Sequence, residues 1–105
     1  MSYKLRFVQE FKQEYAKEYF AIEEQFARFE ESYPGAPRGR RYIAYAGRDA
    51  SNTLIWECEF SSLEEVYKAQ AFFLTDSRHE ELFQEQSTYI IKTYTEIYKP
   101  FEPGQ

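Results

Sequence analysis

The chain has 105 residues and a net charge of −5, from 13 basic and 18 acidic side chains. This length predicts a single domain, residues 1–105, that buries roughly 65% of the surface its unfolded chain exposes. The acidic balance argues against binding a nucleic-acid backbone as the main function. Ten tyrosines and ten phenylalanines supply much ring surface for a core or for a ligand pocket.

Cysteine content and hydropathy give an expectation for the compartment. Cys58 is the single cysteine, so it has no partner for an internal disulfide, and a reducing cytoplasm is favoured. The segment from Met1 to Glu10 lacks the apolar core of a signal peptide, and no apolar run approaches the ~18 residues of a membrane span. We therefore expect a soluble cytoplasmic protein with no membrane contact.

The first third of the chain predicts a strand followed by a helix. In the segment 3–8, Tyr3, Leu5 and Phe7 alternate with Lys4, Arg6 and Val8, which is the two-residue period of a half-buried strand. From Glu14 the period changes to steps of three and four, as on one face of a helix. The residues of this stripe are Tyr15, Tyr19, Ile22, Phe26, Phe29 and Tyr33. Such a stripe is typical of core packing.

Prolines and glycines between residues 34 and 39 end this helix in a loop. Arg38, Arg40 and Arg41 bring three positive charges to the end of that loop. Two interpretations are open, a solvated loop and a site for an anionic group. Charge runs of this kind usually stay in water, so the solvated loop is favoured.

Two neighbouring strands follow, joined by a polar turn. Residues 41–46 form the first, residues 47–52 the turn, and Thr53 to Phe60 the second, so these strands should be antiparallel neighbours. Trp56 lies on the apolar side of its strand and is predicted to be buried. Cys58 lies on the same side and is predicted to be an inert buried thiol.

The last part of the chain predicts an interrupted helix and a final strand. The helix begins at Ser61 or Ser62, breaks near residues 75–77, and restarts with Ser77 and Glu80 as a capping box. The final strand, residues 89–98, is apolar on both faces. Its two predicted sets are Tyr89, Ile91 and Ile97 on one face, and Ile90, Tyr94 and Tyr98 on the other.

The element order β-α-β-β-α-β predicts an α+β, ferredoxin-like domain. Its four-stranded antiparallel sheet carries both helices on one face. The second apolar set of the final strand then has no partner within the chain, and a large exposed apolar patch usually marks an interface. We therefore expect a homodimer in which sheet faces sheet.

The residues from Leu54 to Glu65, LIWECEFSSLEE, then Thr75 to His79, TDSRH, and the final Thr95-Glu96-Ile97 resemble the dimeric α/β-barrel superfamily. Within it the chain is most similar to NIPSNAP-type and antibiotic-biosynthesis-monooxygenase-type domains. The resemblance covers about the second half of the chain. It implies a barrel built from two ferredoxin-like subunits, and it leaves the activity open, because the superfamily includes haem-degrading enzymes, cofactor-free monooxygenases, isomerases and members without assigned chemistry.

Few residues offer chemistry. One histidine, one cysteine and scattered carboxylates do not give the ligands of a zinc site, and no glycine-rich loop precedes a helix, so neither a metal nor a cofactor is predicted. His79 is a weak candidate for a catalytic base, but its charged neighbours favour a solvated position at a helix start. The resemblance to haem-degrading relatives implies an Asn on the first strand and a Trp and a His on the second helix. This chain has Gln9, Phe72 and Phe73 instead, with His79 outside the matching position, so haem degradation is not favoured.

Three functions therefore remain open. The favoured one is binding of a small aromatic or apolar ligand in a cleft between sheet and helices, lined by Tyr42, Trp56, Phe73 and Tyr94, because such a cleft needs only apolar walls and a few polar groups. The second is a cofactor-independent monooxygenase acting on a phenol or quinol, with His79 or a tyrosine removing a proton. The third is a non-catalytic structural or interaction module.

Overall fold

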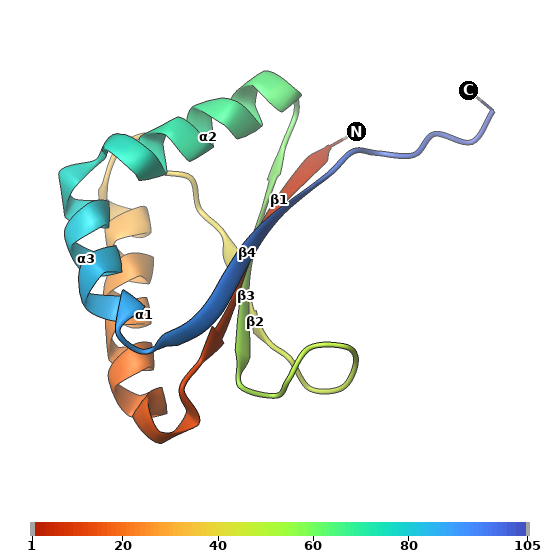
Figure 1. Cartoon of the computed structure of the whole chain (residues 1–105). Coiled ribbons are helices and arrows are strands. Elements are labelled where there is room, and N and C mark those ends of the chain that lie inside the picture. Colours follow the sequence, from red (N-terminus) through yellow and green to blue (C-terminus); the bar gives the residue numbers. More distant parts are fainter. Residues whose placement is uncertain (1, 105) are drawn as a thin grey trace.

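Four antiparallel strands form one sheet in the computed structural model, which describes residues 2–104 (Figure 1). The strand order is β2-β3-β1-β4, and all three α-helices lie on one side of the sheet. This confirms the predicted ferredoxin-like α+β fold. The elements are β1 Tyr3–Phe11, the 3-10 turn η1 Gln13–Tyr15, α1 Ala16–Ser32, β2 Arg40–Ile43, β3 Thr53–Phe60, α2 Leu63–Thr75, α3 Ser77–Ser87 and β4 Ile90–Tyr98.

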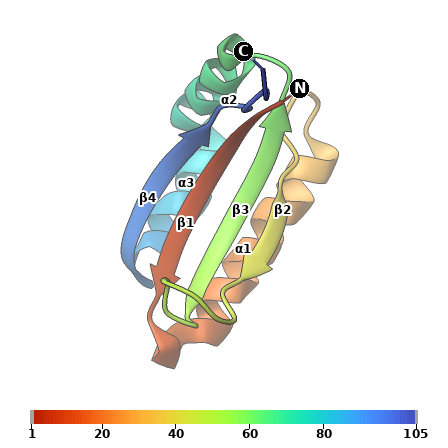
Figure 2. The same ribbon diagram turned by 90° about the vertical axis from the view of Figure 1, so that its right-hand side faces the viewer.

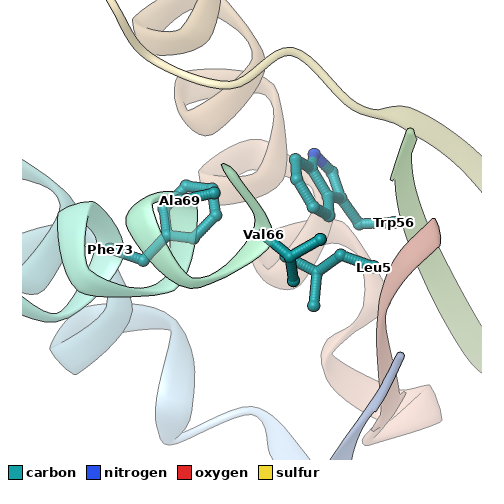
Figure 3. Close-up of a cluster of buried hydrophobic side chains, with 5 residues drawn as sticks. All are labelled: Leu5, Trp56, Val66, Ala69 and Phe73. Carbon is teal, nitrogen blue, oxygen red and sulfur yellow. The ribbon is translucent and has the colours of Figure 1, made fainter. Parts of the chain in front are cut away.

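The alternation of side chains divides the sheet into two different faces. Because β1 pairs Leu5 with Cys58 and Phe7 with Trp56, these four side chains point toward the helices. They meet the apolar side of α2 in a core cluster of Leu5, Trp56, Val66, Ala69 and Phe73 (Figure 3). The other face carries no helix and is turned toward the viewer in Figure 2. We call it the open face.

Side-chain caps start the second and third helices. Ser62 Oγ accepts a hydrogen bond from the Glu65 backbone N–H at 3.2 Å, which begins α2 as predicted. At α3 the cap is Asp76, whose carboxylate accepts from the His79 backbone N–H at 2.9 Å, so the prediction of Ser77 as the cap is wrong. The extended backbone of Asp76 ends α2 and begins α3, and it turns the chain between two helices at a single residue.

The stripe predicted for the first helix forms the contact of α1 with the core. Tyr19, Ile22, Phe26 and Phe29 are buried, whereas Tyr15 and Tyr33 at its two ends are exposed. The regular helix begins at Ala16 after a 3-10 turn, two residues later than the sequence pattern predicts.

The faces of the final strand differ from the prediction at one residue. Tyr94 and Tyr98 lie on the open face, since they pair with Val8 and Lys4 of β1. Ile90 was expected to share that face, but it pairs with Phe11 across an irregularity in the register and packs on the helix side, beside Tyr19. The irregularity shifts the alternation by one residue, which moves Ile90 to the other face.

The second strand is shorter than predicted. It ends at Ile43 instead of continuing to Ala46, and the segment that joins it to β3 is a loop at one end of the sheet (Figure 2).

Candidate functional site

A cavity of about 290 Å³ lies between the helices and the covered face of the sheet. Its size is near the lower end of the range for small-ligand pockets, which begins at roughly 300 Å³. Every α-helix and three of the four strands contribute to the wall. The lining residues are Phe7, Gln9, Glu23, Phe26, Glu30, Leu54, Trp56, Phe73, Leu74, His79, Glu80, Phe83, Gln86, Thr93 and Thr95.

Aromatic rings hold one another in place along this wall. The Phe7 ring stacks on Trp56 with 5.1 Å between centroids, and the Phe73 ring meets both edge-on at 5.4 and 5.5 Å. Such ring pairs stabilise by about 0.5–1.5 kcal/mol beyond their buried area. The rings come from β1, β3 and α2, so the shape of the cavity depends on the packing of three elements.

A buried ion-pair group lies behind the rings. The Arg41 guanidinium, from β2, donates to the carboxylates of Glu23 and Glu30, which are one helical heptad apart on α1. These two carboxylate side chains are only 10% and 7% exposed. Trp56 Nε1 donates to Glu30 at 3.2 Å, and Gln86 Nε2 donates to Glu23 at 2.8 Å. Buried charges require this kind of pairing and hydrogen bonding.

His79 lies on the cavity wall in the first turn of α3. Its ring contacts the rings of Phe26 and Phe73 at centroid distances of 5.0 and 4.8 Å, and its Nδ1 atom is buried without a hydrogen-bond partner. The surface position predicted for His79 is therefore wrong. Its neighbours in sequence are charged, but the helix turns the imidazole inward while Arg78 and Glu80 remain exposed.

Burial lowers the pKa of His79 below its ordinary value, although the carboxylates of Asp76, Glu30 and Glu80 act in the opposite direction. The imidazole is consequently neutral near pH 7. A neutral ring in the wall can accept a hydrogen bond or a proton from a bound molecule.

Gln9 brings a second polar group to the cavity from β1. The Tyr19 hydroxyl donates to Gln9 Oε1 at 2.6 Å, which fixes the amide group. Burial raises the pKa of Tyr19, and the nearby Glu23 carboxylate raises it further, so this hydroxyl stays protonated and continues to donate. Gln9 belongs to the cavity lining, so its amide group can meet a ligand there.

Two of the four predicted cleft residues line this cavity. Trp56 and Phe73 belong to its wall, and Trp56 is 5% exposed, so its predicted burial is confirmed. Tyr42 and Tyr94 lie on the open face, and their placement in the cleft is wrong. The reason is register: Tyr42 pairs with Ile55, and the Tyr94 hydroxyl donates to Asp49 at 2.9 Å on that face.

The buried acidic residues of the wall were not found from the sequence. Glu23 and Glu30 are seven residues apart and lie beside the apolar stripe of α1, and this spacing is the signal that could have shown two inward-facing acids. The arginine that follows them is the other signal. Arg41 is tied to both acids, so a solvated position is wrong for it, whereas Arg38 and Arg40 are exposed as predicted.

The predicted inert, buried Cys58 is only partly buried. Its thiol donates to the Arg38 carbonyl at 3.2 Å. Burial raises the pKa of this thiol, and the Glu30 carboxylate raises it further, so Cys58 stays protonated and unreactive near neutral pH.

Residues 2–104 offer neither a metal site nor a membrane-spanning helix. No group of three or more His, Cys, Asp or Glu side chains in this part of the chain has the arrangement to hold a metal ion. No helix among the same residues has the length and hydropathy to cross a membrane.

The strand order and the single layer of helices define the chain as a ferredoxin-like α+β domain. Solved structures with this fold include NIPSNAP family proteins. The chain is similar to one from Agrobacterium tumefaciens, with a TM-score of 0.76, 15% identity and complete coverage of both chains. It is also similar to a NIPSNAP-like domain protein from Burkholderia xenovorans, with a TM-score of 0.76 and 13% identity over 99% of this chain and 89% of that one.

A second group of similar structures is described as monooxygenases. The chain matches a putative antibiotic biosynthesis monooxygenase from Nitrosomonas europaea with a TM-score of 0.68 and 9% identity, over 97% of this chain and 92% of that one. No protein-family model and no curated protein sequence matches the chain. At these identities the similarity establishes the fold alone.

Proposed function

We propose that the protein binds a small ligand with an aromatic or apolar body in the cavity between the helices and the sheet. The observation that carries this proposal is a preformed cavity with ring walls and a few fixed polar groups, Gln9 and His79 among them. Ligand sites have this composition, because apolar walls supply affinity and a few polar groups set the orientation.

Titration with 1-naphthol, followed through the fluorescence of Trp56, tests the proposal. Trp56 is the only tryptophan and lies in the wall, so binding should change its emission. The substitution Thr95→Phe, which fills the cavity from β4, should weaken binding at least about tenfold through overlap with the ligand. Tyr42→Ala, on the open face, is the matched control and should leave the affinity unchanged. Equal affinities in the two variants would place the ligand elsewhere.

A second candidate function is favoured by the neutral imidazole of His79. A base in an apolar cavity can take the proton of a phenol or quinol, the first step expected of a cofactor-independent monooxygenase with O₂ as oxidant. Oxygen consumption with hydroquinones, compared between the natural protein and His79→Gln, tests this function. Binding without oxygen uptake would leave the ligand-binding proposal standing alone.

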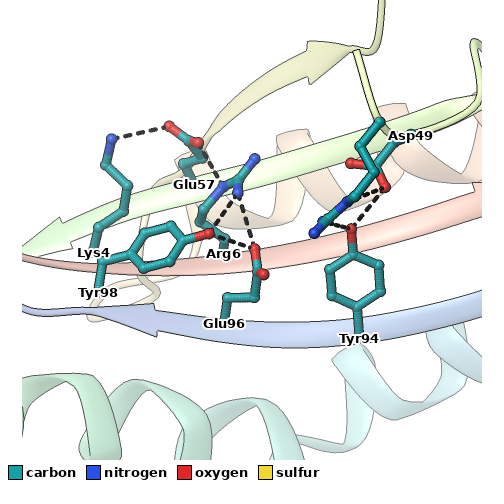
Figure 4. A network of polar contacts seen from close by, with 8 residues as sticks. Lys4, Arg6, Asp49, Glu57, Tyr94, Glu96 and Tyr98 are labelled. Atoms are coloured by element: carbon teal, nitrogen blue, oxygen red, sulfur yellow. Dashed lines mark hydrogen bonds and ion pairs between the residues drawn. The ribbon is translucent and has the colours of Figure 1, made fainter.

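We also propose that the open face is covered by a second copy of the chain. Val8, at the centre of this face, is 1% exposed beneath a network of charged side chains. Arg6 donates to Glu57 at 2.8 Å and to Glu96 and the Tyr98 hydroxyl at 2.9 and 3.0 Å (Figure 4). A surface that holds both signs of charge in fixed positions can meet its own copy across a two-fold axis.

Sedimentation velocity over a range of micromolar protein concentrations tests the homodimer. A sedimentation coefficient that stays at the value of a monomer would remove this proposal and favour a different partner for the open face. We propose a reducing, cytoplasmic environment for the protein, since Cys58 is its single cysteine.

A further inference from the structure

The cavity wall contains more negative than positive charge. Glu23, Glu30 and Glu80 belong to the lining, and it contains no lysine or arginine. Behind the wall, Arg41 compensates one of the two buried carboxylates. Since His79 is neutral, the buried part of the site holds one uncompensated negative charge, and Glu80 adds another where the wall reaches the surface.

Neutral donors contact these carboxylates without cancelling their charge. Glu30 accepts from Trp56 Nε1 and from the Gly39 backbone N–H at 3.1 Å, and Glu23 accepts from Gln86. Hydrogen bonds to a carboxylate favour its charged form. The charge is also felt by neighbouring groups, because the Glu23 carboxylate raises the pKa of Tyr19 and the Glu30 carboxylate raises that of Cys58, in each case after burial as the larger cause.

The apolar part of the wall suits a positive charge as well. The rings of Phe7, Phe26, Trp56 and Phe73 lie around the same cavity. The face of an aromatic ring attracts a cation, and the attraction is stronger where water is excluded. Rings and uncompensated carboxylates therefore favour the same kind of ligand.

We propose that the cavity selects a ligand that carries a protonated amine on its aromatic or apolar body, in preference to an alcohol or a carboxylate of the same shape. This inference rests on the proposed function and specifies the class of ligand. The same charge opposes the formation of a phenolate in the cavity, so it favours binding over proton removal from a phenol.

Three matched probes test this preference by isothermal titration calorimetry near neutral pH. They are 1-naphthylmethylamine, whose amine is protonated, 1-naphthylmethanol and 1-naphthoate. We expect the amine to bind at least about tenfold more tightly than the alcohol, and the carboxylate more weakly than both. If the alcohol binds as tightly as the amine, the inference is wrong and the proposed function stands. If none of the probes binds, the proposed function fails and the inference fails with it.

Charge-removing variants locate the source of the preference. Glu23→Gln removes the buried excess charge, so the amine should lose most of its advantage over the alcohol. Glu80→Gln is exposed and should fold normally, with the advantage reduced by about two- to threefold, because a charge at the surface is partly screened. Glu81→Gln, the exposed neighbour outside the lining, is the matched control and should keep the full advantage. The inference is overturned if Glu80→Gln keeps the full advantage of the amine over the alcohol, as Glu81→Gln does, and Glu23→Gln either keeps that advantage as well or does not fold.

Discussion

Each face of the sheet holds an arginine between two glutamates, and the two groups differ in how far the glutamate side chains are buried. On the covered face Arg41 joins two carboxylates of α1 that are 10% and 7% exposed. On the open face Arg6 joins Glu57 and Glu96 of the neighbouring strands, which are 20% and 25% exposed. The two arginine side chains are almost equally exposed, at 21% and 19%, so the difference lies in the carboxylates.

This difference separates a buried ion-pair group from one that solvent can reach. Removing Arg41 would leave two charges in a place that water barely reaches, whereas Glu57 retains Lys4 at 3.5 Å and access to solvent. An arginine between two glutamates is therefore shielded from water on the covered face and remains in reach of water on the open face.

The largest effect is expected from Arg41→Met. Leaving Glu23 and Glu30 without a counter-charge should lower the free energy of unfolding by about 3–5 kcal/mol. Arg6→Met is the matched variant on the open face and should cost about 1 kcal/mol or less in dilute protein, because Glu57 and Glu96 keep some access to solvent. Urea unfolding of both variants measures this difference. Equal losses of unfolding free energy in the two variants would show that the two ion-pair groups are equally shielded from water.

A smaller loss is expected from Gly39→Ala, at the contact between the loop and the cavity wall. A Cβ atom at residue 39 would lie 2.0 Å from a carbon of the Trp56 indole, so the ring or the loop must move. Overpacking of this kind costs about 1–3 kcal/mol.

The double variant Gly39→Ala, Trp56→Phe tests the cause. The smaller ring gives the methyl group room, so the cost of the alanine, measured by urea unfolding, should shrink on this background. A cost that is unchanged would assign the effect to the backbone of the loop instead of the ring.

The open face can be tested with one charge placed on each side of β4. Tyr94→Glu places a carboxylate on the open face and should raise the dimer dissociation constant at least about tenfold, or 1.4 kcal/mol. Ile97→Glu places the same charge at an exposed position on the helix side, since Ile97 pairs with Leu5, and should leave association unchanged. Sedimentation equilibrium gives both constants. Dissociation by Ile97→Glu alone would move the interface to the helix side.

The sequence predicts the fold because its periods are local. The alternation around Trp56 and the stripe from Tyr19 to Phe29 each require only neighbouring residues to be read. The register of β4 depends on an irregularity opposite Phe11 that no local pattern shows, and Ile90 was misplaced for that reason.

The candidate site was less predictable because its polar groups meet across the fold. Gln86 reaches Glu23 over 63 residues of sequence, and Arg41 reaches the same carboxylate over 18. Trp56 and Phe73 could be predicted from their apolar surroundings. The inward position of His79 could not, because the Asp76 cap sets the direction of the first turn of α3.

The smallest effect is expected from the titration of His79, which tests whether its imidazole is neutral on the covered face. Its pKa is lowered in the folded chain, so the unfolded chain binds the proton more readily. The contribution of His79 to the free energy of unfolding should therefore be fully present above the unfolded pKa of about 6.5. This contribution should be lost as the pH drops through the lower folded pKa.

His79→Gln cannot take up this proton, so it should lose less stability between neutral and mildly acidic pH than the natural protein. The carboxylates that face the ring, those of Asp76, Glu30 and Glu80, are present in both proteins, so their contribution cancels in the difference. Denaturant unfolding of both proteins at neutral and at mildly acidic pH measures this difference in stability loss. If the natural protein and His79→Gln lose the same amount of unfolding free energy, His79 is solvated. A greater loss in the natural protein would mean that acid adds a positive charge to the cavity wall, and binding of a protonated amine should then weaken over the same pH range.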